Sequence, residues 1–502
     1  MRRELAIEVS PAETRAALLE DGKVVEVLHE RRRRQGIVGN IFLGRVHRVL
    51  PGMQAAFVSI GLERDAFLYV EDAMPRDAEA AAENGGAADS GNGPAASRED
   101  APRIDDLVKE GQQIVVQAAK DPLAGKGPRV TTALSLPGRT LVHLPGGRGV
   151  GISRRIVDEG ERDRLRSLME ALPGGGGWIA RTAAQGASAE ELEADRAYLV
   201  DLAARVARKA EESGAPTVLH RELDLSLRVL RDVSSPELAA VHVDDEDAAV
   251  RLREFARTVS PAVAGRIELW RGDIPMFTAL GVEAEIERAL TNRVPLPSGG
   301  SLVIQQTEAL VAIDVNTGRY VGKDALEETV FATNLEAVPE VARQIRLRDL
   351  GGLIVVDFID MEQEAHRREI FDRFVEELSR DRARTRVLPM SEFGLIEVTR
   401  QRSRGNLERT LTRPCPVCAG SGRVRNDTTL ALDLVRALQA EKGLFLPGEE
   451  VSVRVAPTLW RLLAEEETDL LGSAEEQLNI RVRLQPDETI GPAEFEIVRS
   501  SI

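Results

Sequence analysis

The chain has little cysteine, few aromatic side chains and no long apolar run. Its 502 residues include two cysteines, both within CPVC at residues 415–418, which argues against a disulfide-stabilised secreted protein and fits a reducing cytoplasm. The chain contains no stretch of about 18 apolar residues, so the sequence predicts no transmembrane helix. The start MRRELAIEVS lacks the apolar core of a secretory signal. We therefore expect a cytoplasmic protein with no membrane partner. The chain also lacks GxxxxGK[ST], the phosphate-binding loop of many ATP-binding proteins.

An excess of acidic residues gives a net charge of −16, which by itself argues against a nucleic-acid partner. The excess lies in two segments: residues 71–106 contain ten acidic and three basic residues, and residues 426–502 contain fifteen and seven. By contrast, residues 380–425 contain eleven basic and four acidic residues. A solvated face with local ion pairs would explain any single arginine. Their clustering predicts a basic surface that the net charge conceals.

The length favours several domains over one. The first thirty residues alternate apolar and polar side chains, with Asp21 and Gly22 as a hairpin turn between two strands. Residues 39–72 continue the alternation and predict a small antiparallel barrel, which resumes at residues 108–121. Between these two parts, residues 73–104 are acidic and without periodicity, which predicts a disordered insertion in a barrel loop.

The second half of the chain mixes helices with apolar strands. Apolar spacing predicts helices over residues 188–213, 282–290 and 325–350, and apolar runs predict strands over residues 301–306, 309–318 and 353–361. The two strands ALVAID and GLIVVD each end in an aspartate, Asp314 and Asp357, and a crossover helix separates them. The simplest topology is strand, helix, parallel strand, which brings both carboxylates to the same edge of one sheet.

Two carboxylates at one sheet edge suit magnesium, which binds one or two carboxylates together with water and phosphate oxygens. Asn316 lies two residues after Asp314, faces the same way and could hold an anion or orient water. Magnesium there could polarise a phosphoryl oxygen and activate water, which hydrolyses phosphodiesters without a Ser, Cys or His nucleophile. The alternative is that each aspartate only caps the loop after its strand.

The cysteine pair CPVCAGSG has the spacing and following glycines of half a zinc site. A structural zinc takes four ligands, and the chain supplies two thiols, Cys415 and Cys418. Either the pair binds no metal, as a free thiol pair or redox couple, or two chains share one zinc. The second reading predicts a homodimer.

Several residues could bind RNA. Phe57 and Phe67 lie on the barrel strands, with Lys120 and Lys126 after them, and barrels of this kind stack bases on exposed aromatic rings. The alternative for each phenylalanine is a place in the core. Arg181 and Thr182 follow the strand GWIA and could bind a terminal phosphate, although an arginine at a strand end is commonly only solvated.

The chain resembles the ribonuclease E/G family over nearly its whole length. The motifs that carry the resemblance stand in family order: GIVGNIFLGRVHRVLPGMQAAFVSIGL, IARTAAQG, AIDVNTGRYVGK, TNLEA, ARQIRLRDLGGLIVVDFIDM, GLIEVTRQR and CPVCAGSGRV. The resemblance implies a magnesium-dependent endoribonuclease that acts in rRNA maturation and mRNA decay. Such an enzyme cuts single-stranded RNA, prefers a 5′-monophosphorylated end, and leaves 5′-phosphate and 3′-hydroxyl products.

The resemblance also implies a multidomain α/β and α+β fold. A ribonuclease-H-like domain is interrupted by an oligonucleotide-binding (OB-type) barrel and a 5′-sensor, and is followed by a deoxyribonuclease-I-like α/β catalytic domain, a zinc link and a small C-terminal domain. The implied boundaries are 1–36 with 223–289 for the ribonuclease-H-like domain, 37–132 for the barrel, 133–222 for the sensor, 290–411 for the catalytic domain, 412–425 for the zinc link and 426–502 for the last domain.

Residue roles follow from the same motifs. The resemblance implies that Asp314 and Asp357 hold the catalytic magnesium, with Asn316 assisting at the scissile phosphate. It implies a 5′-phosphate pocket made of Gly138, Val142, Arg181, Thr182 and Arg384, and RNA contacts at Phe57, Phe67 and Lys126. It further implies that Cys415 and Cys418 share zinc (Zn²⁺) between two chains, and that tetramers are pairs of such dimers.

Two features depart from the family. The acidic insertion is longer than usual, and the chain stops at Ile502, so we expect no scaffold tail for assembling a degradosome. The residues themselves leave two other functions open: a non-catalytic RNA-binding or ribosome-associated factor, and a magnesium-dependent phosphatase that acts on small substrates.

Overall fold

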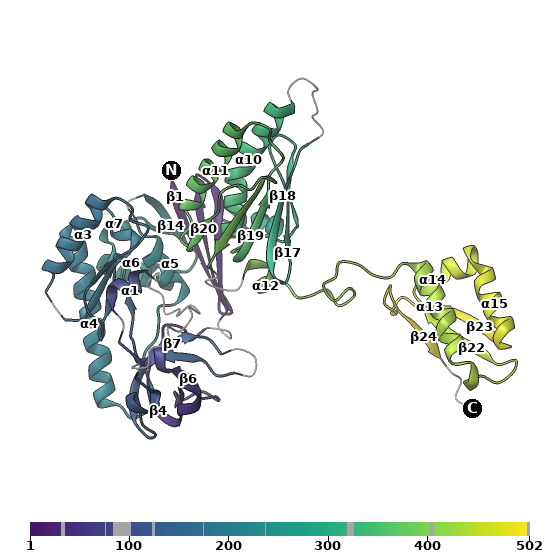
Figure 1. Ribbon diagram of the computed structural model, residues 1–502, viewed down its shortest axis with the longest axis horizontal. Helices are drawn as coiled ribbons and strands as arrows, with labels where there is room; N and C mark the ends of the chain where they lie inside the picture. Colours follow the sequence, from purple (N-terminus) through teal and green to yellow (C-terminus); the bar gives the residue numbers. More distant parts are fainter. Residues whose placement is uncertain are drawn as a thin grey trace. The chain divides into compact units, whose positions relative to one another are not determined.

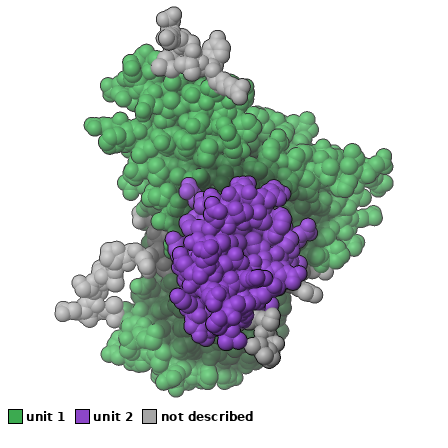
Figure 2. Space-filling view, turned by 90° about the vertical axis from the view of Figure 1, so that its right-hand side faces the viewer, with its two compact units in different colours: residues 1–410 green, residues 411–502 purple. Residues whose placement is uncertain are grey.

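The computed structural model describes residues 1–31, 36–75, 77–83, 102–122, 126–173, 175–235, 237–318, 326–401 and 406–498. These residues form two compact units, residues 1–410 and residues 411–502, which Figure 2 distinguishes by colour. Within the described residues, no helix is both long enough and apolar enough to cross a membrane.

The first sheet of unit 1 has five strands in the order β15-β14-β1-β2-β3. Its strands are β1 (Arg3–Val9), β2 (Glu13–Glu20), β3 (Lys23–Arg31), β14 (Leu238–Val243) and β15 (Ile267–Leu269). Asp21 and Gly22 both have positive φ, as a two-residue hairpin turn requires, so the predicted hairpin is confirmed. The core of this region also includes side chains from α5 (Leu225–Val233), α6 (Glu246–Val259) and α7 (Pro261–Ala264). Two short helices, α8 (Met276–Ala279) and α9 (Val282–Ala289), follow.

The second sheet closes into a five-stranded barrel, because β4 pairs with both β5 and β7. Its strands are β4 (Ile41–Leu50), β5 (Ala55–Ser59), β6 (Ala66–Tyr69), β7 (Gln113–Lys120) and β8 (Arg129–Thr131), with turns η2 (Pro51–Met53) and η3 (Val70–Ala73). Closure leaves few unpaired strand edges, and the alternating apolar residues fill the interior. β13 (Thr217–His220), which the sequence assigned to the sensor segment, also pairs with β4.

The expectation of a disordered insertion over residues 73–104 is wrong for the part of it that the structure describes. Residues 78–83 form helix α1 (Ala78–Glu83), and residue 104 begins α2 (Ile104–Leu107). Ala78 and Ala82 are buried against Val142, Leu144 and Ile179, because alanines are small enough to let the helix lie directly on the sheet. Low complexity therefore concealed a packed helix. Residue 76 and residues 84–101 lie outside the described part of the chain.

The third sheet has four strands in the order β11-β12-β10-β9. They are β9 (Leu136–Pro137), β10 (Leu141–Leu144), β11 (Val150–Ile152) and β12 (Gly177–Ala180). Helices α3 (Glu159–Ala171) and α4 (Ala189–Glu212) share a core with these strands, and η4 (Thr182–Ala184) follows β12. The predicted helix over residues 188–213 is confirmed. It begins at Ser188, whose hydroxyl accepts the Glu191 backbone N–H.

The fourth sheet has six strands in the order β16-β17-β18-β19-β21-β20. They are β16 (Arg293–Pro295), β17 (Ser301–Gln306), β18 (Leu310–Asn316), β19 (Gly352–Asp357), β20 (Thr385–Val387) and β21 (Leu395–Arg400). β18 and β19 are parallel and are joined through α10 (Leu326–Leu347), so the predicted strand, helix, parallel strand unit is confirmed. Figure 1 shows α10 and α11 (Glu364–Ser379) on the same side of this sheet. The short helix α12 (Leu407–Leu411) ends the region.

A buried ion pair joins this sheet's crossover helix to the first sheet. Arg346 of α10 donates two hydrogen bonds of 3.0 Å each to the carboxylate of Glu20 at the end of β2, and both residues are buried. Burial alone would raise the pKa of Glu20, but the hydrogen bonds and charge of Arg346 lower it. The position of α10 is therefore tied to the N-terminal strands.

Unit 2 is built on a three-stranded sheet in the order β23-β22-β24. The strands are β22 (Glu450–Val455), β23 (Arg481–Pro486) and β24 (Phe495–Val498), and the helices are α13 (Asp427–Ala440), α14 (Pro457–Arg461) and α15 (Thr468–Leu478), with turns η5 (Lys442–Leu444) and η6 (Leu462–Glu466). One apolar core unites helices and strands. The unit thus has a core of its own, apart from unit 1.

Candidate active site

Asp314 and Asp357 lie directly opposite each other on the parallel strands β18 and β19. Their neighbours in sequence, Ile313, Val315 and Val356, are buried in the core that includes residues of α10 and α11. Because side chains alternate along a strand, the two aspartates face the other side of the sheet, where both are exposed. The carboxylates thus lie within the strands, near their C-terminal ends, on the face away from the helices.

Asn316 shares this face and donates its side-chain amide to Oδ2 of Asp314 at 2.7 Å. The interaction orients one carboxylate of the pair. On the other strand, burial raises the pKa of Asp357, and the charges of Asp314 and Asp360 raise it further. A cation bound between these carboxylates would relieve their repulsion.

The residues present fit magnesium better than a fully coordinated metal. No group of three or more His, Cys, Asp or Glu side chains in the described ranges has the geometry of a metal site. Two carboxylates on an exposed face suit an ion that keeps several waters and binds substrate oxygens. They would not form the closed ligand set of a structural metal site.

The loop after β19 is held by two side chains of α10 that the sequence analysis did not single out. Asn334, fully buried, donates to the backbone oxygen of Ile359 at 2.8 Å and accepts the Ile359 N–H at 3.0 Å. Glu327 accepts the backbone N–H groups of Glu362 and Gln363 at 3.0 and 3.2 Å. Because Ile359 lies between Asp357 and Asp360, Asn334 sets the course of the chain that carries both carboxylates.

The residues expected to sense a 5′ phosphate surround the start of β10 and the end of β12. Arg181 donates to the backbone oxygen of Gly138 and makes two hydrogen bonds of 3.0 Å with Oδ1 of Asp232. Thr182 shares a hydrogen bond of 3.1 Å with Ser153. Arg181 is therefore held in place rather than merely solvated, and Asp232, which holds it, was not identified from the sequence.

Gly138 and Val142 have supporting roles in the described structure. A Cβ on Gly138 would lie 2.5 Å from both carboxylate oxygens of Asp195, so glycine is required for this close approach. Asp195, buried on α4, accepts the backbone N–H groups of residues 139, 140 and 141 at 3.1, 2.8 and 2.8 Å. Val142 is buried and packs against α1. The loop before β10 is thus shaped by one buried carboxylate.

Arg384 belongs to the loop after α11, and this loop reaches the sensor segment. Arg155 donates to the backbone oxygen of Ala383, the residue before Arg384. Asp381 in the same loop is buried and accepts the Nε–H of Arg400 at 2.6 Å. Arg384 itself is exposed. The loop therefore links β21 of the six-stranded sheet with the segment that follows β11.

On the barrel, Phe57 and Phe67 are register partners on β5 and β6, with ring centroids 4.7 Å apart. Both are half-buried. Tyr69 lies 6.5 Å beyond Phe67, and Arg129 lies 5.0 Å above the Tyr69 ring. The sequence analysis missed Tyr69 and Arg129, although the spacing of Phe67 and Tyr69 on one strand puts them on one face.

A hollow of about 460 Å³ adjoins Phe57 and is lined by His47, Arg48, Asp65 and Glu110. Arg48 pairs with Phe57 across β4 and β5, so a cation stands beside the aromatic row. Lys120, at the end of β7, and Lys126, before β8, are exposed. The barrel thus presents rings and positive charge together.

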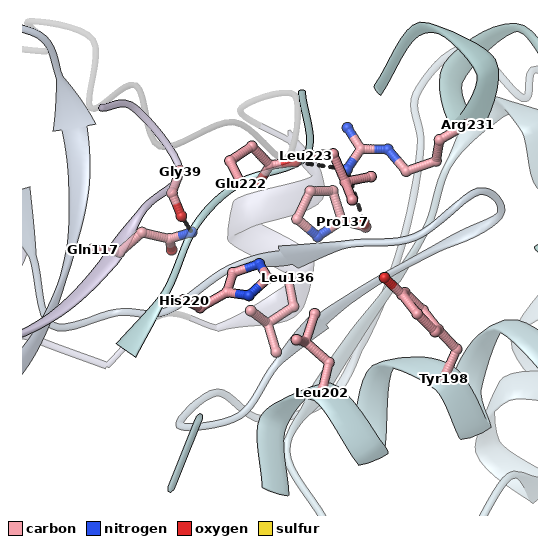
Figure 3. A pocket seen from close by; sticks show the side chains of 10 residues that line it. All are labelled: Gly39, Gln117, Leu136, Pro137, Tyr198, Leu202, His220, Glu222, Leu223 and Arg231. Atoms are coloured by element: carbon pink, nitrogen blue, oxygen red, sulfur yellow. Dashed lines mark hydrogen bonds and ion pairs between the residues drawn. The ribbon is translucent and has the colours of Figure 1, made fainter. Parts of the chain in front are cut away.

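A smaller pocket lies between the barrel and the sensor segment (Figure 3). Its central space is about 10 Å³, the lower limit for one water molecule, so it is a packed junction rather than a ligand site. Arg231 donates there to Glu222 at 3.0 Å and to the backbone oxygen of Pro137 at 3.1 Å. Gln117 of β7 donates to Gly39 and, outside the pocket, to Ser135. These bonds tie the barrel to the loop before β10.

Cys415 and Cys418 lie in a tight turn of unit 2. Hydrogen bonds from the backbone at Gly422 and Gly420 lower the pKa of the Cys418 thiol, and Cys415 adds a further hydrogen bond. Ala419, Gly420 and Gly422 have positive φ, so the backbone curls around the sulfur. A thiolate stabilised in this way suits a metal ligand, and the two thiols form half of a four-ligand site.

Comparison with known proteins agrees with this architecture. The model of the ribonuclease E/G family matches residues 135–403, and that of the RNase E/G thioredoxin-like domain matches residues 414–500. The chain therefore belongs to the ribonuclease E/G family of endoribonucleases. It is a multidomain α/β protein with a five-stranded barrel, a catalytic region and a thioredoxin-like domain.

The similar proteins are ribonucleases G and E. Ribonuclease G of Escherichia coli K12 is 40% identical over 500 residues, which cover 99% of this chain and 100% of its own. Ribonuclease G of Haemophilus influenzae is 40% identical over 497 residues, 99% of each chain. Ribonuclease E of Escherichia coli K12 is 35% identical over 504 residues, 99% of this chain and 46% of its own.

The role of Asn334 can be tested through metal binding. Replacing Asn334 with alanine leaves the Ile359 N–H and C=O without their partner and frees the segment from Asp357 to Asp360. We expect Mn²⁺, as a spectroscopic substitute for Mg²⁺, to bind about tenfold more weakly, as measured by electron paramagnetic resonance of the free ion. Thr333→Val is the matched control, because it removes a buried hydrogen bond within α10 that does not reach the loop. Equal weakening in both variants would contradict a positioning role.

Proposed function

We propose that the exposed face of the six-stranded sheet is a magnesium-dependent centre that cuts single-stranded RNA to leave 5′-phosphate and 3′-hydroxyl ends. The observation that carries the proposal is the pairing of Asp314 with Asp357 across parallel strands, on the face free of α10 and α11. Membership of an endoribonuclease family supplies the substrate class. The ribonuclease-H-like and deoxyribonuclease-I-like assignments and the domain boundaries belong to the same proposal.

In this proposal Asp314 and Asp357 hold the ion, and Asn316 fixes the orientation of the Asp314 carboxylate. When bound there, magnesium would offset charge on the phosphoryl oxygens and lower the pKa of water. The water oxygen would bond to phosphorus as the bond from phosphorus to the 3′ oxygen breaks, with the water losing a proton and the departing 3′ oxygen gaining one to become the 3′-hydroxyl. Asn334 and Glu327 keep the loop after Asp357 in place throughout. The side chains thus orient and balance charge while water acts as the nucleophile.

The barrel provides the path for the strand to be cut. Phe57, Phe67 and Tyr69 form a row of rings on which bases can stack without regard to sequence. Arg48 beside the hollow, together with Lys120 and Lys126, offers positive charge to the phosphates. The acidic net charge of the whole chain does not oppose this, because it is concentrated outside the barrel strands.

The 5′ end of the RNA is proposed to bind at Arg181, Thr182 and Arg384, on the loop formed by Gly138 and its neighbours. Both terminal nitrogens of Arg181 donate to one oxygen of Asp232, Oδ1, so the guanidinium is already oriented before RNA binds. Asp195 holds the loop from below by three backbone hydrogen bonds. A 5′ monophosphate would therefore meet a pre-arranged arginine.

Zinc is proposed to join two chains through their CPVC turns, and pairs of such dimers would form tetramers. The support is the low pKa of Cys418 and the count of two thiols in the chain.

Removal of one catalytic carboxylate should abolish cleavage. Asp314→Asn keeps the size and the sheet but loses half of the charge that holds the ion, so we expect a fall of at least 1,000-fold in the rate of cutting a single-stranded oligoribonucleotide in Mg²⁺. Gel analysis of end-labelled RNA measures it. Asp372→Asn, on the exposed side of α11, is the control. Near-wild-type cutting by Asp314→Asn would overturn the proposed centre.

The 5′-sensor proposal concerns a ratio of rates. Wild type should cut a 5′-monophosphorylated oligoribonucleotide about tenfold faster than its 5′-hydroxyl or 5′-triphosphate form. The charge-assisted contact with the phosphate is lost in the 5′-hydroxyl form and is crowded in the 5′-triphosphate form. Arg181→Ala should bring the ratio close to one while leaving the 5′-hydroxyl rate unchanged. Arg205→Ala, an exposed arginine of α4 in the same region, should keep the ratio. If the ratio of rates is unchanged in Arg181→Ala, the sensor lies elsewhere.

The zinc proposal fixes a stoichiometry. Metal analysis of purified protein should give about one zinc per two chains, because four thiols complete one site. Cys415→Ser should remove the zinc and halve the mass measured by light scattering, whereas Ser421→Ala in the same turn should change neither. One zinc per chain, or a mass indifferent to Cys415→Ser, would refute the shared site.

A further inference from the structure

Phe393 is the most exposed aromatic side chain in the described residues, with 79% of its surface accessible. Most of this ring is therefore free to stack on a partner. Phe393 lies in the connection between β20 and β21. The three aromatic rings of the barrel row are less exposed than this one.

The connection that carries Phe393 is a tight turn. The Ser391 N–H bonds to the backbone oxygen of Leu395 at 2.9 Å, and the Leu395 N–H bonds to the Ser391 hydroxyl at 3.2 Å. Gly394 has φ +75°, in the region that favours glycine, and its N–H bonds to the Ser391 oxygen at 3.1 Å. The ring is thus presented by an ordered backbone, which lowers the entropy lost when it binds a partner.

This turn adjoins the catalytic carboxylates. Leu395, two residues after Phe393, is the register partner of Asp357 on β21 and β19. A Cβ built on Gly394 would lie 3.4 Å from a carboxylate oxygen of Asp360 and 3.3 Å from the backbone oxygen of Phe358. Gly394, the residue after Phe393, therefore lies close to the acidic loop that follows β19.

We propose that Phe393 stacks on a base of the RNA close to the bond that is cut, and so helps to hold the strand in position for cleavage. The inference rests on the proposed function, since it requires RNA across the Asp314–Asp357 face. A single-stranded RNA offers unpaired bases, and a base on an aromatic ring is the contact that holds such strands irrespective of sequence. The barrel row stacks bases at a separate sheet; Phe393 would do so at the reacting phosphate.

A test compares Phe393→Leu with single abasic positions in the RNA. A 5′-monophosphorylated oligoribonucleotide carries one abasic nucleotide at each position around the cut. For the wild-type protein, an abasic nucleotide at one of these positions should lower kcat/KM about tenfold relative to intact RNA. On intact RNA, Phe393→Leu should lower kcat/KM about tenfold relative to wild type. The two losses should not add, because both remove the same stack. Phe393→Tyr keeps an aromatic ring and should leave the rate close to that of wild type. Val250 is another exposed apolar residue, and Val250→Ala should not change the rate.

A second measurement separates this inference from the proposed function. Protein carrying Asp314→Asn, which should bind without cutting, is mixed with a set of RNAs that each contain 2-aminopurine at one position, and the position with the strongest quenching is used. Its fluorescence should be quenched, and adding Phe393→Leu should relieve the quenching. Absence of cutting by wild type would refute the proposed function while this measurement still tests the stack.

Three results would overturn the stacking proposal: additive losses at every abasic position, quenching unaffected by Phe393→Leu, or wild-type cutting by Phe393→Leu. If Phe393→Leu instead lowers the mass measured by light scattering in step with the rate, the ring contacts a second copy of the chain and not RNA.

Discussion

Two like charges held side by side on adjacent parallel strands are the constraint around which unit 1 is arranged. Neighbouring strands lie about 4.8 Å apart, so the two carboxylates repel each other, although water around their exposed oxygens screens the repulsion. The pKa of Asp357 is raised first by burial and then by the charges of Asp314 and Asp360. The sheet tolerates the repulsion because its other face is buried by α10 and α11, so the strands are held by their core and not by the residues that carry the chemistry. In the proposed centre, a divalent cation would turn the unfavourable pair into a binding site.

Helix α10 is the element that makes this arrangement specific. It is the crossover between β18 and β19, fills the core below them, and holds the loop of Asp357 and Asp360 through Asn334. Arg346 near its end is tied to Glu20 on the first sheet. Buried ion pairs add little net stability, but losing one partner of such a pair is costly, so they fix position more than they add strength. Arg400 with Asp381 and Arg181 with Asp232 act in the same way at the loops that carry Arg384 and the sensor.

Much of this was predictable from local pattern. The alternation of apolar residues predicted the strands and the Asp21–Gly22 hairpin, and the two strands ending in aspartate predicted the parallel unit, because these depend on periodicity and on the handedness of a single connection. The prediction failed at residues 78–83, where an alanine-rich, acidic stretch forms a helix. Its low complexity gave no sign that Ala78 and Ala82 would pack on β10 and β12. Packing of small residues depends on the partner surface, which no local pattern reveals.

The sequence by itself determined the chemistry available to this protein: two aspartates after apolar strands, two cysteines in one turn, aromatic residues on barrel strands, and the family to which their order belongs. Tertiary structure decided which side chains meet. Asp232 behind Arg181, Asp195 beneath Gly138 and Asn334 beside Ile359 come from segments 51, 57 and 25 residues away. Such contacts are not encoded in any one stretch of chain, because a hydrogen bond between distant residues exists only once separate cores have packed. The periodicity of apolar residues specifies the strands and helices. The polar contacts that orient the side chains and loops of the site form only when one element packs on another.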